Sequence, residues 1–369
     1  MQKKRHPILT ALCIPFSLIY GVIIFIRNQC FNTGLFPSRE FNLPVITVGN
    51  ITVGGTGKTP HVEYVVSLLN DNFKLAVLSR GYMRKSSGFV VASTASTAEE
   101  VGDEPLQIKK KYPSVEVAVD AKRVRGMKNL ISYNPELEAV ILDDAFQHRW
   151  IKPGISILLV DYNQPLKNDL LLPAGRLREP VSAKNRAAIV VITKCPPDIK
   201  PIERRILSRD LNLFPWQSLF FTTFSYGEPL PVFPDAKSSG AIESFEDNKP
   251  FVLMITGIAS PDLFAGYLEG ISSGIESVSF PDHHNFTKRD MERILKVWKS
   301  INHKYKVMIT TEKDAMRLQF LSETEPEIKR NIYYIPIRVR FVKKDGEEFN
   351  KQIINYVRNN KRNHIISQK

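Results

Sequence analysis

A glycine-rich segment between two apolar stretches constrains the fold more than any other part of this 369-residue chain. Residues 45–60 read VITVGNITVGGTGKTP. The β-branched residues 45–48 predict a buried strand, and residues 61–69 predict a helix. A strand, a glycine loop, a Lys-Thr pair and a helix in this order are typical of the phosphate-binding loop of nucleotide hydrolases and kinases.

The residue types in this loop suit phosphate binding. Glycines let the backbone turn tightly and direct its N–H groups at phosphate oxygens, and the helix N-terminus adds partial positive charge. Lys58 would reach the β- and γ-phosphates, and the Thr59 hydroxyl would bind Mg²⁺. The strict motif begins with glycine, whereas this chain has Thr52 there. The expected nucleotide-binding residues are Thr52, Val53, Gly54, Gly55, Thr56, Gly57, Lys58 and Thr59.

The rest of the first half alternates between strands and helices. Apolar runs predict strands over 74–78, 115–119, 139–142, 155–160 and 188–193, with helices over 97–111 and 121–131. This order favours a parallel sheet covered by helices on both faces, in which ligands collect at the carboxyl ends of strands. Asp143 and Asp144 follow one such strand, and an acidic residue there is expected to hold Mg²⁺.

A second, smaller α/β unit is predicted after a segment rich in Pro, Gly and aromatic residues around 220–233. The alternating residues 331–342 could pair with that segment as a two-stranded linker. The expected division is an N-terminal membrane-associated helix (1–30), a P-loop kinase domain (31–219), linker strands with the smaller domain (220–342), and a C-terminal helix and tail (343–369).

Residues 7–26 carry no charge and are flanked by basic residues. As a helix they would be about 30 Å long, roughly the thickness of a bilayer core. A buried core helix, a membrane span and an interfacial anchor all fit this pattern. The net charge of +13 indicates an anionic partner, and no compact basic cluster with interleaved aromatics favours nucleic acid. The three cysteines form neither a disulfide framework nor a metal motif, in keeping with a reducing cytosol.

Several polar motifs leave alternatives open. Asp103 is either a catalytic carboxylate or a carboxylate on a helix surface. Asp282-His283-His284 lacks a third ligand at zinc spacing, but an Asp and a His joined across a cleft could take a proton from an alcohol. The loop 172–180 carries Arg176 and Arg178, which suit phosphate oxygens or solvent. Residues 311–314 (TEKD) could cap a helix or take part in catalysis.

Taken together, these motifs resemble the tetraacyldisaccharide 4′-kinase family, and the resemblance extends to about Val342. The segments that carry it are 48–60, 79–82, 102–104, 143–148, 172–179, 282–283 and 311–314. It implies transfer of the γ-phosphoryl group of ATP, with Mg²⁺, to the 4′-hydroxyl of a tetraacylated glucosamine disaccharide 1-phosphate in lipid A biosynthesis. It also implies two α/β domains joined by a two-stranded linker, and action at the cytoplasmic face of the bacterial inner membrane.

The resemblance also implies roles for single residues. Asp103 paired with His283 would activate the sugar hydroxyl, with His284 as the competing choice. Asp143 and Asp144 would serve Mg²⁺ and the transferring phosphate, and Lys58 and Arg178 would stabilise its charge.

The expected partners are the lipid substrate and the membrane surface, with no nucleic acid and no obligate protein partner. A membrane-associated P-loop NTPase that acts as a switch or motor is the alternative; it would hydrolyse ATP without an acceptor. A nucleotide-gated scaffold that binds anionic lipid is a third, non-enzymatic possibility.

Overall fold

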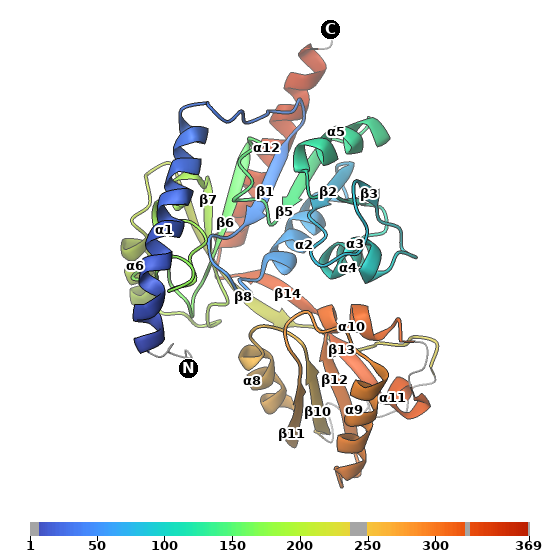
Figure 1. Cartoon of the computed structure of the whole chain (residues 1–369). Helices are drawn as coiled ribbons and strands as arrows, with labels where there is room; N and C mark the ends of the chain where they lie inside the picture. The colour runs from blue at the N-terminus through green and yellow to red at the C-terminus, as the bar shows by residue number, and fades with distance from the viewer. Residues whose placement is uncertain (1–6, 237–248, 322–324, 368–369) are drawn as a thin grey trace.

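The computed structural model describes residues 7–236, 249–321 and 325–367, which form two sheets with flanking helices (Figure 1). The larger sheet has the strand order β14-β8-β7-β6-β1-β5-β2-β4-β3. Its strands are β1 (Val45–Gly49), β2 (Leu75–Ser79), β3 (Val90–Val91), β4 (Glu116–Val119), β5 (Ala139–Asp143), β6 (Ile155–Asp161), β7 (Ile189–Thr193), β8 (Ser218–Tyr226) and β14 (Ile337–Phe341). All pair in parallel except the antiparallel edge strands β3 and β14, which confirms the expected parallel sheet.

Helices bury both faces of this sheet. Apolar side chains of α2 (Lys58–Leu69), α4 (Asp103–Lys111) and α12 (Asp345–Ser367) cover one face, and those of α5 (Arg123–Tyr133) pack on the other. A separate cluster includes residues of α6 (Pro201–Leu211) and of the 3₁₀ helix η1 (Val181–Arg186). The C-terminal helix α12 packs against α2, β8 and β14, and its Tyr356 hydroxyl accepts a hydrogen bond from the Val45 amide at 3.1 Å.

The smaller sheet has the order β11-β10-β12-β13-β9. Its strands are β9 (Leu230–Pro231), β10 (Phe251–Thr256), β11 (Gly274–Ser279), β12 (Lys306–Thr311) and β13 (Ile332–Ile335), with helices α8 (Asp262–Ile271), α9 (Lys288–Ser300), α10 (Glu312–Leu318) and α11 (Pro326–Asn331). The chain passes between the sheets twice, and β8 pairs with β14 there, as expected for a two-stranded linker. Residues 331–342 form two strands rather than one, with Pro336, which lacks an N–H donor, between them.

The expected helix over 97–111 is divided into α3 (Ala98–Val101) and α4. Gly102 lies between them with a φ of 92°, a backbone conformation that interrupts a helix and that glycine adopts without strain. Asp103 is therefore the first residue of α4 rather than an internal helix position. This placement turns it toward the second sheet instead of solvent, and it is 6% exposed.

Helix α1 (Pro7–Asn32) lies along the first domain. One stripe, including Ser17, Ile24 and Phe31, is buried, and Ser17 donates to the Leu171 carbonyl at 3.0 Å. Most of its other large apolar side chains are exposed, which excludes a buried core helix. Among the described residues it is the one helix long and apolar enough to cross a membrane.

Candidate active site

The phosphate loop joins β1 to α2 and is held in shape by side chains. Gly54 and Gly57 have φ values of 107° and 84°, and a Cβ on Gly57 would lie 2.7 Å from the Phe224 ring. The Asn50 amide donates to the Thr56 hydroxyl at 2.9 Å, and the Thr193 hydroxyl donates to the Thr56 carbonyl at 2.9 Å. The loop is thus held by Asn50, which follows β1, and by Thr193 of β7, and Gly57 stands where a side chain would not fit.

The loop 172–180, which we call the arginine loop, pairs with the outer edge of the phosphate loop and is not a free solvated segment. The Val53 amide donates to the Arg176 carbonyl and the Arg178 amide to the Ile51 carbonyl, each at 2.8 Å. Thr52 forms a bridge with Leu177. The Val53 N–H is therefore used by this pairing, and Arg178 is brought to Asp144, with an Nη2–Oδ1 distance of 3.3 Å.

His61 supports the phosphate loop through hydrogen bonds to Gly57 and Thr222, and sequence reasoning missed it. Its Nδ1 lies 2.7 Å from the Gly57 carbonyl and its Nε2 lies 3.0 Å from the Thr222 hydroxyl. Since a carbonyl only accepts, Nδ1 carries the proton and Nε2 accepts from Thr222. Burial lowers the pKa of His61 to about 4, against the smaller raising effect of the Gly57 hydrogen bond. His61 is one turn after Gly57, and this spacing was its only signal in the sequence.

The acidic pair at the end of β5 faces the loop. Asp143 accepts a hydrogen bond from Ser79 at 3.0 Å, and burial, with the charges of Glu104 and Asp144, raises its pKa. Asp144 has a φ of 44° and lies 3.7 Å from the Lys58 ammonium. Burial opposes its ionisation, but Lys58 and Arg178 hold the pKa of Asp144 below its usual range.

These oxygens suit a hard cation. No group of three or more His, Cys, Asp or Glu side chains in the described part of the chain could hold a metal by itself. Mg²⁺ commonly takes one or two carboxylates and completes its shell with water and substrate phosphates. Asp143 and Asp144 are such a pair, beside a phosphate loop.

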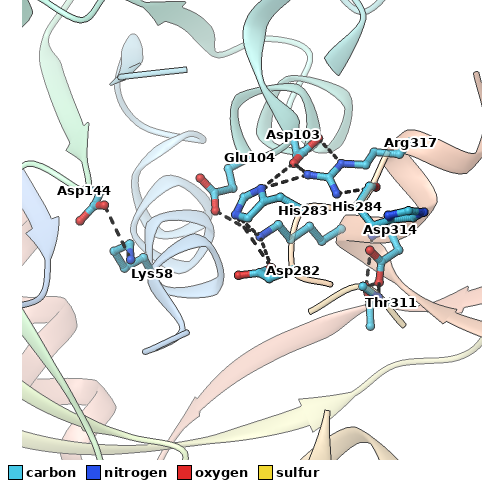
Figure 2. A network of polar contacts seen from close by, with 12 residues as sticks. Lys58, Asp103, Glu104, Asp144, Asp282, His283, His284, Thr311, Asp314 and Arg317 are labelled. Atoms are coloured by element: carbon cyan, nitrogen blue, oxygen red, sulfur yellow. Dashed lines mark hydrogen bonds and ion pairs between the residues drawn. The ribbon is translucent and has the colours of Figure 1, made fainter. Parts of the chain in front are cut away.

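The second chemical group lies across the cleft (Figure 2). His283 Nδ1 is 3.1 Å from Asp103 Oδ2, and this contact joins the smaller domain to the P-loop domain. Arg317 of α10 donates through Nε to Asp103 Oδ1 at 2.7 Å and through Nη2 to the other oxygen. Burial acts to raise the pKa of Asp103, but these bonds from His283 and Arg317 hold it below its usual range. The carboxylate is therefore ionised and fixed.

The two adjacent histidines have different partners in the structure. His283 has a φ of 60°, and its Nε2 lies 2.9 Å from the Lys313 ammonium. His284 Nε2 instead bonds Asp290 at 2.9 Å, and its ring stacks on Phe280. His283 is thus the histidine that meets Asp103.

Two adjoining cavities occupy the space between the sheets. The smaller, of about 190 Å³, is lined by Thr56, Gly57 and Thr59 and by apolar residues including Phe224, Tyr226 and Leu263. The larger, of about 580 Å³, brings together the expected residues Thr52, Val53, Gly54, Gly55, Lys58, Asp143, Asp144, Arg178 and His283. Arg27, Arg80 and Arg123 line it as well, so that its six cationic side chains outnumber its four carboxylates.

Three buried nitrogens of the larger cavity, Arg123 Nε, His148 Nε2 and Arg178 Nε, have no hydrogen-bond partner. Unsatisfied buried polar groups are costly, so their presence beside several arginines marks a site for a polar, anionic ligand.

Asp103 is absent from the lining residues because it stands behind His283. Sequence reasoning missed Arg317 and left the TEKD motif, with Lys313, open between capping and catalysis, because nothing in the sequence indicates which distant residue each one faces.

Comparisons with known proteins agree with this geometry. The profile of the family described as Tetraacyldisaccharide-1-P 4′-kinase (LpxK) matches residues 9–358. A tetraacyldisaccharide 4′-kinase of Bacteroides thetaiotaomicron is 48% identical over 363 residues, with 96% of this chain and 95% of the relative covered. One of Phocaeicola vulgatus is 48% identical over 355 residues, with 96% of each chain covered.

A solved structure, LpxK from Aquifex aeolicus in complex with ATP, matches with a TM-score of 0.71 and 29% identity over 95% of this chain and 99% of that chain. The agreement extends through both sheets, and the relatives' shared name selects phosphoryl transfer over a switch or motor. The chain therefore belongs to the tetraacyldisaccharide 4′-kinase family and is a lipid kinase of lipid A biosynthesis.

Proposed function

We propose that this cleft moves the γ-phosphoryl group of ATP to the 4′-hydroxyl of a tetraacylated glucosamine disaccharide 1-phosphate, with His283 as proton acceptor. The observation that carries this proposal is the Asp103–His283 pair. His283 lines the same cavity as Lys58 and Asp144, and Asp103 contacts the His283 ring. Phosphoryl transfer requires positioning and charge neutralisation, and both are provided by residues that converge on this space.

The nucleotide would be held at the phosphate loop. The residues 54–59 would contact its phosphates, whereas Thr52 and Val53 would act by fixing the loop, since the Val53 amide is already bonded to Arg176. The related Aquifex protein was solved with ATP. Asp143, Asp144 and Thr59 would hold Mg²⁺, which when bound neutralises charge on the phosphates.

His283 would act on the acceptor hydroxyl. Asp103 can only accept, so we assign the ring proton to Nδ1, which leaves the Nε2 lone pair for the substrate. As the 4′-oxygen forms its bond to the γ-phosphorus, the bond to the β–γ bridging oxygen breaks, ADP leaves, and Nε2 takes the hydroxyl proton. Lys58 and Arg178 would stabilise the charge that develops on the phosphoryl oxygens.

The acceptor's acyl chains require a membrane-bound enzyme. Each buried CH₂ contributes about 0.8 kcal/mol to membrane binding, so a four-chain lipid does not leave the bilayer readily. Helix α1 exposes an apolar surface and is tied to the arginine loop by the Tyr20 hydroxyl, which donates to the Arg178 carbonyl at 2.8 Å. We place the body on the cytoplasmic face of the inner membrane, where ATP is available.

The test is transfer of labelled phosphate from ATP to the disaccharide 1-phosphate in mixed micelles. We expect His283→Gln and Asp103→Asn to lower kcat by about 10²- to 10⁴-fold, the usual contribution of general acid–base catalysis. Lys58→Ala should abolish transfer. ATP hydrolysis that persists unchanged in His283→Gln, with no labelled lipid formed by the unaltered chain, would overturn the proposal.

A further inference from the structure

Lys313 covers the one nitrogen that the proposed reaction requires to be free. Its Nζ lies 2.9 Å from His283 Nε2, 3.4 Å from Asp282 Oδ1 and 3.7 Å from Glu104 Oε1. An ammonium only donates, so it occupies the Nε2 lone pair. In this arrangement His283 cannot accept a proton from a sugar hydroxyl.

Lys313 also lies where the two cavities meet. Gly55, Lys58, Glu104, Asp282 and Lys313 line both of them. The smaller cavity contains the phosphate-loop residues Gly57 and Thr59, and the larger contains His283. A group transferred from nucleotide to acceptor has to pass this junction, beside the Lys313 side chain.

We propose that Lys313 is a catalytic cation that leaves His283 for the transferring phosphoryl group when nucleotide and acceptor are bound. The inference rests on the proposed role of His283. One movement then has two effects: it uncovers the base, and it places a positive charge on the oxygens of the transferring group. A lysine suits this role because its charge is compact and its stem is flexible.

The charges around Lys313 fit an ammonium that can move. It is held by two carboxylates that are themselves partly exposed, Asp282 and Glu104, and its own side chain is 21% exposed. Asp103, by contrast, is bonded on both oxygens by Arg317 and stays in place. The charged groups that face His283 are Asp103, Asp282, Lys313 and Arg317. Of these, Lys313 is the cation whose anionic partners are exposed enough to release it.

Lys313 is brought to the cleft by the contact between the two domains. It lies on α10, which is capped by Thr311 accepting from the Asp314 amide at 3.1 Å. The same helix reaches the P-loop domain through Glu312, whose Oε1 lies 3.2 Å from the Lys111 ammonium, and through Arg317. The lysine therefore comes from the opposite domain to the phosphate loop, as a cationic finger does in other phosphoryl-transfer enzymes.

The experiment measures kcat and KM for ATP and for the lipid acceptor in Lys313→Met, Lys313→Arg and Lys306→Met. Lys306 is the control, because its ammonium bonds the carbonyls of Trp298 and Ile301 in the same domain, away from the cleft. We expect Lys313→Met to lower kcat by about 10²- to 10³-fold, the typical effect of removing one transition-state donor. KM for ATP should change less than fivefold, Lys313→Arg should recover at least a tenth of the activity, and Lys306→Met should behave as the unaltered chain.

The split between kcat and KM for ATP, together with the rescue by Lys313→Arg, separates this role from a structural one. A kcat of Lys313→Met within threefold of the unaltered chain, equal losses in Lys313→Met and Lys306→Met, or no recovery in Lys313→Arg would overturn the inference. His283→Gln is measured in parallel: full activity there refutes the proposed base, whereas its loss beside an active Lys313→Met refutes only the role of Lys313.

Discussion

At the scale of single residues, the site contains backbone conformations that ordinary residues avoid. Asp144 and His283 have φ values of 44° and 60°, in the left-handed region. Such conformations cost on the order of 1–3 kcal/mol and persist where the surroundings enforce them. Here Lys58 and Arg178 hold Asp144, and the Gly257 carbonyl accepts from the His283 amide at 3.2 Å. In the proposed reaction, this strain would direct Asp144 to the nucleotide and His283 to the acceptor.

His61 makes stability depend on pH. Its folded-state pKa, about 4, lies below the ordinary value of 6.5, so the unfolded chain binds a proton first as pH falls. This contribution is full above pH 6.5 and is lost toward pH 4. Between pH 7.5 and 5 we expect His61 to account for about 2 kcal/mol of lost unfolding free energy. Urea unfolding of the unaltered chain and His61→Gln at both pH values measures it. Equal pH dependence of the two proteins would contradict a neutral, buried His61.

The residues that sequence reasoning found are those whose chemistry is local. Lys58 and Thr59 follow from contiguous spacing, since strand, loop and helix are adjacent in the chain. Arg317 and Asp103 are 214 positions apart, and their contact exists only after both sheets have folded. An isolated arginine on a short helix gives no sign of the carboxylate that it will meet, whereas the family resemblance supplied the Asp103–His283 pair directly.

At the scale of elements, strands were better predicted than the helices around the cleft. β6 (Ile155–Asp161) matches the expected strand 155–160 to within one residue, because a buried parallel strand is a continuous apolar run. α10 was not identified, since it has only seven residues and four of them are charged, although Ala315, Met316 and Leu318 join the apolar core. Such a helix has no periodic apolar signal, although its capping threonine was visible in the TEKD motif.

Arg317 gives α10 a positioning role that can be tested. We expect Arg317→Met to lower kcat by about 10-fold or more with little change in KM for ATP, because Asp103 loses its fixed geometry. Burial then raises the pKa of Asp103 without opposition from Arg317, so the acidic limb of the kcat profile should move to higher pH.

The control for this variant is Arg204→Met, which breaks a similar pair, since Arg204 Nη2 donates to both oxygens of Asp345 at 2.8 and 2.9 Å. That pair is remote from the cleft, so its loss should leave the pH profile unmoved. Arg317→Lys restores the charge but not the forked geometry, and should recover only part of kcat. Identical profiles for all three variants would remove the positioning role.

At the scale of the whole molecule, α1 attaches an exposed apolar surface to the catalytic cleft. Its buried stripe contacts the loop 171–179, with Arg27 Nη1 3.2 Å from Glu179 Oε1, and this loop carries Arg178 to the phosphate loop. The opposite face presents Leu12, Phe16 and Ile23, each more than half exposed. The proposed anchor is therefore fixed beside the site where a lipid head group would have to arrive.

The last prediction concerns this exposed face. Phe16→Asp with Ile23→Asp leaves the buried stripe of α1 intact, so the fold and ATP binding should be retained. Charged residues on a membrane-inserted helix cost about 2.5–3.5 kcal/mol each near its centre, so we expect the bound fraction on anionic phospholipid vesicles to fall by more than 10-fold in a flotation assay. Activity on micelle-dispersed acceptor should fall with it.

The matched control for α1 carries the same two charges on another exposed apolar pair, Ile202→Asp with Ile206→Asp on α6, whose side chains are 58% and 42% exposed. If membrane binding belongs to α1, this control floats with the vesicles as the unaltered chain does. Equal release of both variants would mean that exposed apolar area in general, rather than the helix fixed beside Arg178, holds the enzyme on its substrate. The contact between α1 and the arginine loop would then serve folding alone, and catalysis would not depend on where the anchor is attached.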